Sequence, residues 1–176
     1  QQIVRDIKAE YATTEPKLEI VFEKLEDTPT KVMPPVAQYY LVRAIYTAHN
    51  GVYKMSADFD DLVETSNNIA KVTVGDGKLQ VQCLTRSSVE SSKFDLANGL
   101  RAAFELMGCE VEFSGSSPGW TPNPNSSILP VLSDLYEKQN GKSANVVACH
   151  AGLECGILGT NYPDMEMISF GPTIRG

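Results

Sequence analysis

Polar side chains able to face a ligand gather near the C-terminal end of the chain, in the run from His150 to Gly156. The run follows an apolar stretch at 145–149 and precedes a second apolar stretch at 165–170. Two such stretches separated by a short helix are typical of buried parallel strands, which present ligand sites at their carboxyl ends. There a carboxylate can accept a hydrogen bond from an amine, and glycine lets backbone amides approach a ligand. We therefore predict a substrate-facing turn made by His150, Gly152 and Glu154.

A zinc site is the alternative for the same run, because Cys149, His150, Glu154 and Cys155 are all possible zinc ligands. Their spacing matches no common zinc module, and no second ligand pair accompanies them. A thiol at the end of an apolar stretch is also an ordinary buried residue. The pattern favours the substrate-facing turn, so no metal ligand is assigned to the chain. No catalytic residue is assigned either, because no serine lies in a nucleophile elbow and no histidine in a recognisable triad.

Arg86 is the second candidate for ligand binding. It directly follows the strand predicted at 79–85. An arginine at the end of a strand can hold a carboxylate through two parallel hydrogen bonds. A solvated arginine that simply ends the strand is the other interpretation, and these residues alone favour it. Upstream, Asn67 and Asn68 are predicted to be turn residues, and the acidic run 58–64 a solvated face.

Composition limits the classes of function. The chain of 176 residues is 42% hydrophobic and 21% charged, as in globular proteins, and its formal net charge is −7. This charge argues against binding to nucleic acids or anionic membranes, which requires clustered Lys and Arg. No apolar stretch approaches the roughly 18 residues that span a bilayer. The four cysteines form no C-x-x-C pair, which favours reduced thiols in a cytoplasmic protein over disulfides.

Periodicity and turn signals predict the order β-α-β-β-α-β between residues 16 and 113. Gly75-Asp76-Gly77 is a strong hairpin signal between the two central strands. This order is that of the ferredoxin-like fold, an antiparallel sheet with two helices on one face. A further helix is predicted at 3–11. The predicted strands are 17–26, 69–74, 79–85 and 110–113, and the predicted helices between them are 36–49 and 94–107.

A domain boundary is predicted where Gly, Ser, Pro and Asn dominate, at 114–125. We accordingly predict an α+β chain with two domains, 1–116 and 117–176, the second holding a partial α/β parallel sheet. Because such a small sheet would be exposed at both edges, we expect the chain to be part of a larger enzyme.

Several motifs resemble those of the aminoacyl-histidine dipeptidases, also called Xaa-His or cytosol non-specific dipeptidases. The resemblance spans most of the chain and is most specific over its last sixty or so residues. Its motifs are Pro118-Gly119-Trp120, the run 150–156, Tyr162 to Met167 and Gly171-Pro172-Thr173, with 63–66 and 83–87 upstream.

The resemblance implies a dinuclear zinc peptidase whose α/β catalytic domain is interrupted by a lid domain of ferredoxin-like units, which also forms a homodimer. It implies that Arg86 binds the free carboxylate of a dipeptide and that the turn from His150 to Glu154 lines the cleft beside the metals. The family's zinc ligands and its catalytic Glu would lie before Gln1 and after Gly176. We therefore expect two zinc ions in the parent enzyme, none bound by this chain alone, and no activity of the chain alone.

A self-contained ferredoxin-like module for ligand binding or dimerisation is the alternative function. The Pro-rich exit from the predicted module and the half-built parallel sheet after it favour the enzyme.

Overall fold

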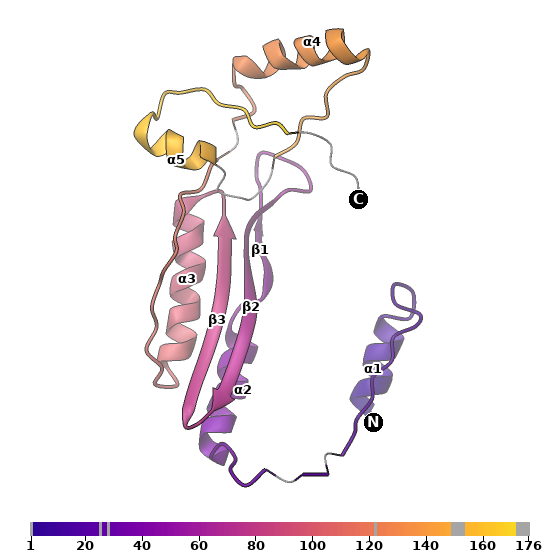
Figure 1. The fold of residues 1–176 in the computed structure, drawn as a ribbon, viewed down its shortest axis with the longest axis vertical. Coiled ribbons are helices and arrows are strands. Elements are labelled where there is room, and N and C mark those ends of the chain that lie inside the picture. The colour runs from indigo at the N-terminus through magenta and orange to yellow at the C-terminus, as the bar shows by residue number, and fades with distance from the viewer. Residues whose placement is uncertain (1, 25, 28, 122, 149–153, 172–176) are drawn as a thin grey trace. The chain divides into compact units, whose positions relative to one another are not determined.

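The computed structural model describes residues 2–24, 26–27, 29–121, 123–148 and 154–171. They divide into two compact units, 1–32 and 33–176. The first unit holds helix α1 (Gln2–Glu10), as predicted. The second unit holds all other helices and strands (Figure 1): α2 (Pro35–Thr47), β1 (Gly51–Met55), β2 (Val63–Gly75), β3 (Lys78–Ser87), α3 (Glu90–Glu105), α4 (Ile128–Asn140) and α5 (Glu154–Asn161).

The sheet of the second unit is antiparallel, in the order β1-β2-β3. The predicted hairpin joins β2 to β3, and its two turn residues, Asp76 and Gly77, have φ of 50° and 73°. Positive φ at both positions matches the twist of the flanking strands, which explains why the sequence Asp-Gly occurs here. The long β2–β3 ladder is the main structural feature of the sheet (Figure 1).

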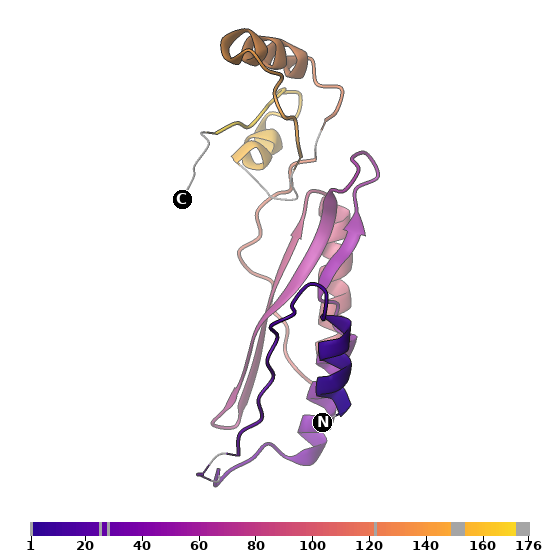
Figure 2. The same ribbon diagram turned by 90° about the vertical axis from the view of Figure 1, so that its right-hand side faces the viewer.

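Helices α2 and α3 pack on the same face of the sheet (Figure 2). The core between helices and sheet consists of small and large apolar residues that fit together without polar atoms: Ala44, Ala48, Leu96, Leu100 and Phe104, with Ile69 and Val81 of the sheet against them. Val81 therefore points inward, as the alternation along the predicted strand 79–85 required.

The α+β class is confirmed, but the strand assignments need correction. The described residues of 17–26 and 110–113 form no strand. The predicted order β-α-β-β-α-β is therefore wrong at its first and last strands. Up to residue 105 the second unit instead has the order α-β-β-β-α. The additional strand is β1, which pairs with the first residues of β2, since β2 begins at Val63 and not at residue 69. A strand forms where backbone groups find a ladder partner, and local alternation does not supply that partner.

The segment after α3 still contributes to the core, although it is not a strand. Cys109 and Val111 pack against the core cluster. The guanidinium carbon of Arg101 lies 4.0 Å from the centroid of the Phe113 ring. The segment therefore runs back along α3 (Figure 1), held by side chains rather than by a ladder.

The predicted parallel sheet is likewise not formed, since the described residues of 145–149 and 165–170 are extended without a ladder. Helix α4 precedes the first of these stretches and ends at Gly141, whose φ of 67° is typical of a C-terminal cap. The Glu166 carboxylate caps the N-terminal end of α4. Its Oε2 accepts hydrogen bonds from Ser127 Oγ (2.6 Å) and Ile128 N (3.0 Å). Hydrogen bonds from Ser127, Ile128 and Ser126 outweigh the effect of burial and lower the pKa of Glu166.

Candidate substrate-binding site

Arg86 is the penultimate residue of β3 and is paired with Ser66 of β2. Alternation from the inward-facing Val81 puts the Arg86 side chain on the face of the sheet opposite the helices. The side chain is exposed, and its guanidinium makes no hydrogen bond or ion pair with the described residues. A solvent-facing guanidinium on a rigid strand can bind a carboxylate. The structure thus gives Arg86 a position compatible with its predicted role, which stays a prediction.

Glu154 is the first residue of α5 and is exposed. A carboxylate in the first turn of a helix is favourably placed against the helix dipole. His150 and Gly152, the other two residues of the predicted turn, lie outside the described residues. Of the predicted substrate contacts, Arg86 and Glu154 can therefore be located on the fold.

A buried polar network surrounds the ends of β2 and β3 next to Arg86. Thr65 is fully buried, and its Oγ1 lies 2.8 Å from Ser87 Oγ. Glu64 is also buried and forms an ion pair of 3.0 Å with Lys54, whose ammonium also donates to Ser92 Oγ. The prediction that 58–64 is a solvated face is therefore wrong for Glu64. The β-branched residues Val63 and Thr65, two positions apart, were the available signal that a strand begins there.

The pKa of Glu64 reflects this network. Burial raises the pKa of the carboxyl, but hydrogen bonds from Ser92, Lys54 and Thr65, together with the Lys54 charge, outweigh it. The net effect lowers the pKa of Glu64 from its usual value, so the carboxylate stays ionised. Glu64 therefore acts as a fixed negative charge that holds Lys54 and α3 against β2.

Asn67 is a structural residue in the middle of β2, which corrects its predicted place in a turn. Its side chain is buried, donates to His49 O (2.8 Å) and accepts from Thr85 Oγ1 (3.0 Å). One amide thus joins the end of α2 to both long strands. Because the donor and the acceptor are both used, we assign Asn67 to the scaffold and not to ligand binding.

A second polar cluster lies where β3 turns into α3 and meets the segment 116–121. The Lys93 ammonium donates to Glu90 Oε1 (2.6 Å), Ser116 Oγ (3.1 Å) and Ser117 O (2.9 Å). Glu90 Oε1 also accepts from Gly119 N (2.7 Å). We call the group Glu90, Lys93 and Gly119 the corner clamp. It was not predicted from the sequence, because Gly119 lies more than twenty residues along the chain from Glu90 and Lys93.

Two glycines bring three backbone segments into direct contact beside the corner clamp. A Cβ at Gly119 would lie 2.6 Å from Ser88 O, and a Cβ at Gly156 would lie 2.7 Å from Pro118 O. Both distances are too short for any other residue without backbone movement. The end of β3, the segment around Gly119 and the first turns of α5 are therefore stacked backbone on backbone.

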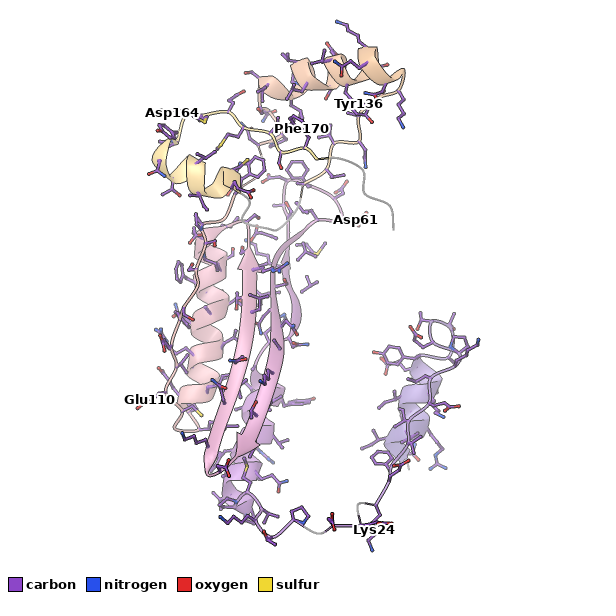
Figure 3. The ribbon with its side chains drawn as sticks, in the orientation of Figure 1. Lys24, Asp61, Glu110, Tyr136, Asp164 and Phe170 are labelled. Atoms are coloured by element: carbon purple, nitrogen blue, oxygen red, sulfur yellow. The ribbon has the colours of Figure 1, made fainter. Side chains whose placement is uncertain are left out.

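An apolar groove of about 890 Å³ lies beneath α4. Figure 3 shows Tyr136 of α4 and Phe170 of the extended C-terminal segment at this end of the unit. The groove is lined mainly by apolar side chains, among them Leu129, Leu132, Val146, Met167 and Trp120. Apolar lining of this size is typical of a surface that another element or molecule covers.

Among the described residues, no group of three His, Cys, Asp or Glu side chains is placed to hold a metal ion. None of the helices in the described ranges is long and apolar enough to cross a bilayer. By fold and site, the second unit is thus an α+β segment with an exposed arginine, a buried polar scaffold and an apolar groove.

Comparison with known proteins identifies which proteins share this segment. No protein-family profile matches the chain. In sequence it is 32% identical over 170 residues to the cytosol non-specific dipeptidase of Escherichia coli (strain K12), a match that covers 97% of this chain and 35% of that protein. In structure it is similar to the crystal structure of aminoacylhistidine dipeptidase from Vibrio alginolyticus, with a TM-score of 0.88 and 36% identity over 98% of this chain and 35% of that chain.

The predicted resemblance to the aminoacyl-histidine dipeptidases is therefore confirmed in sequence and in fold. The chain spans about a third (35%) of the length of the relatives it matches.

Proposed function

We propose that the chain supplies substrate contacts to a zinc-dependent dipeptidase that hydrolyses dipeptides of the Xaa-His type. The observation that carries the proposal is the TM-score of 0.88 to an aminoacylhistidine dipeptidase over 98% of the chain. In this proposal residues 1–116 form a lid and dimerisation domain, and residues 117–176 form a portion of the catalytic domain. The enzyme would act in the cytoplasm, in keeping with the name of its E. coli relative.

Arg86 carries the binding step of the proposal. Its guanidinium faces solvent from the end of a paired strand, so a dipeptide carboxylate can approach it without displacing a partner among the residues that the structure describes. Two parallel hydrogen bonds would fix both the position and the orientation of the C-terminal residue. The turn from His150 to Glu154 would line the cleft, with the Glu154 carboxylate available to accept a hydrogen bond from an amine.

Zinc chemistry is assigned to the whole dipeptidase and not to the residues of this chain. The described residues offer no group of three metal-ligating side chains, so they do not fit a metal centre. In the proposed enzyme two zinc ions would polarise the peptide carbonyl, held by residues other than those of this chain. This chain alone would bind a dipeptide weakly and leave it intact.

A titration of the 15N-labelled chain with Gly-His tests the binding step. We expect the Arg86 side-chain signal to shift with Gly-His and to shift much less with the same dipeptide as its C-terminal amide. Arg86→Lys, which keeps the charge and loses the planar fork, should weaken binding. An equal response to the acid and the amide would contradict the role of Arg86.

A chimera tests the activity. Replacing the matched segment of the E. coli cytosol non-specific dipeptidase with this chain should retain zinc-dependent hydrolysis of Xaa-His dipeptides. Arg86→Gln in the chimera should raise KM more than it lowers kcat, because a carboxylate contact is made in both the ground and transition states. Hydrolysis by the isolated 176-residue chain with added zinc would contradict the proposal.

Homodimerisation through the first predicted domain is part of the same proposal. In the described part of the sheet β1 is an edge strand with all its residues exposed. Helix α2 also exposes Tyr39, Tyr40 and Tyr46. Unpaired strand edges and tyrosines are common in interfaces. Sedimentation of the chain should show a dimer, and Tyr46→Glu should shift it towards the monomer.

A further inference from the structure

We infer that the corner clamp fixes the position of Arg86 relative to the first turn of α5, so that Glu90, Lys93 and Gly119 are positioning residues of the substrate site. The inference rests on the proposed function, since it concerns the same two substrate contacts. Three observations support it: the hydrogen bonds of a buried lysine, the shared oxygen of Glu90, and the backbone stacking at two glycines.

Lys93 is the centre of the clamp. Its side chain is only 11% exposed, although an ammonium is strongly hydrated when free. An ammonium has three protons, and here each has its own acceptor, on Glu90, Ser116 and Ser117. A buried ammonium with every proton used has one favourable orientation. The start of α3 and the segment 116–117 are therefore held in one relative arrangement.

Glu90 extends this arrangement to Gly119. Its Oε1 accepts from both the Lys93 ammonium and the Gly119 amide. Burial alone would raise the pKa of Glu90, but the Lys93 hydrogen bond, the Gly119 amide and the Lys93 charge lower it, which keeps the acceptor ionised. Thr121 Oγ1 adds a hydrogen bond of 3.0 Å to Ser88 O. The segment is thus attached at both ends to the corner between β3 and α3.

Backbone stacking carries the position on to α5. Gly119 packs on Ser88, and Gly156 packs on Pro118. Arg86 precedes Ser88 by two residues, and Glu154 precedes Gly156 by two residues. Each substrate contact is therefore two residues away from a backbone contact that has no room for a Cβ. A short, close-packed connection of this kind fixes geometry far better than a connection through loops.

Pulsed EPR distances in the full 176-residue chain test the inference. Spin labels at Gln82 of β3 and Leu158 of α5, with the native cysteines replaced by alanine, report the relative position of the two elements. Both positions are exposed. We expect one narrow distance distribution in this labelled chain before any further substitution. Lys93→Met, which keeps the apolar stem, and Gly119→Ala should each broaden or shift it.

Three further variants separate positioning from stability. Glu105→Gln lies on the same helix, in an exposed pair with Arg101 at 4.0 Å, and should leave the distribution narrow. Glu90→Gln keeps an acceptor oxygen for the Gly119 amide and should be milder than Glu90→Ala. A change in the EPR distance while the circular dichroism spectrum stays unchanged marks positioning, which a merely stabilising residue would not produce.

The outcomes for the clamp and for the proposed function are distinguishable, because the distances are measured without any dipeptide. A narrow, unshifted distribution in folded Gly119→Ala and Glu90→Ala would overturn the clamp, whatever Arg86 binds. If Lys93→Met fails to fold, these two variants decide. If the distribution broadens as expected, the affinity for Gly-His should fall several-fold in Glu90→Ala and recover in part in Glu90→Gln. Failure of Gly-His to bind the unsubstituted chain would instead count against the proposed function.

Discussion

The two parts of the second unit, residues 33–113 and residues 123–171, differ in how their apolar segments are used. In the first part β2 pairs along its length with β3, and the helices cover one face of the sheet. In the second part the apolar stretches around 145–148 and 165–170 are extended, with no ladder among the described residues. Similar local patterns thus give a closed core in one part and an open groove in the other.

The distribution of buried apolar side chains shows this difference, because those that the structure describes as buried all lie in the first part. Leu96 and Phe104 in the first part are 3% and 6% exposed, whereas Val147 and Phe170 in the second are 75% and 87% exposed. Exposed apolar side chains gain nothing from the hydrophobic effect until another surface covers them. The first part therefore provides most of the stability of the chain, and the second depends on polar caps and glycine contacts.

Amide hydrogen exchange should show the largest contrast between the two parts. Amides in the β2–β3 ladder open only with the core, so we expect their exchange to be slowed by about 10³-fold or more. The extended residues 145–148 and 165–170 should exchange nearly as fast as an unfolded chain. Equal protection of both parts, read by mass spectrometry or NMR, would mean that the second part is closed in solution.

Paired alanine substitutions should sharpen the same contrast. Phe104→Ala removes a buried ring from the core and should cost about 3–5 kcal/mol of unfolding free energy. Phe170→Ala removes an exposed ring and should cost about 0.5 kcal/mol or less. Chemical denaturation followed by circular dichroism measures both. A large loss from Phe170→Ala would show that the groove is filled in solution.

These contrasts explain which parts of the fold could be predicted from the sequence. The helices and the hairpin at Gly75-Asp76-Gly77 followed from periodicity and turn chemistry, which are local. The described residues of 17–26 and 110–113 form no strand. Alternation predicted strands there because it cannot say whether a partner strand is available. Strand β1 was missed for the converse reason: it depends on pairing with β2.

The same distinction applies to the candidate site. Arg86 could be proposed as a substrate contact because a charged residue at a strand end is a local signal, and its role stays a prediction. The corner clamp could not, because Lys93 and its partners Ser116 and Ser117 meet only in the folded chain. Glu64 and Asn67 were misassigned because polar residues are usually exposed, and only the three-dimensional structure shows the hydrogen bonds that stabilise them when buried.

Glycine substitutions should give an intermediate effect that depends on location. Gly156→Ala places a Cβ 2.7 Å from Pro118 O, so we expect a loss of about 1–3 kcal/mol. Gly99→Ala is the matched control, because it lies inside α3 with no atom within 4 Å of the added Cβ. The control should stabilise the chain by about 0.5–1 kcal/mol, since alanine favours a helix. Thermal unfolding of the two variants in parallel compares them, and similar effects in both would contradict the backbone stacking at Gly156.

The smallest expected effect is the pH dependence of helix α4 in the second part. The lowered pKa of Glu166 means that its capping of α4 stabilises the chain fully above the ordinary carboxyl pKa of 4.5 and is lost as the pH falls through the lower folded value. Helix α4 should therefore fray in acid before the β2–β3 ladder opens, as followed by NMR signals of Ile128 and its neighbours. Glu166→Gln should remove the contribution of this carboxyl to the pH dependence of α4. Glu64 and Glu90 also have lowered pKa values, so acid should weaken the β2–β3 ladder equally in the unsubstituted chain and in Glu166→Gln. The difference in pH dependence between these two proteins therefore reports on α4. An unchanged pH profile for α4 in the variant would mean that its first turn is held by something other than this carboxylate.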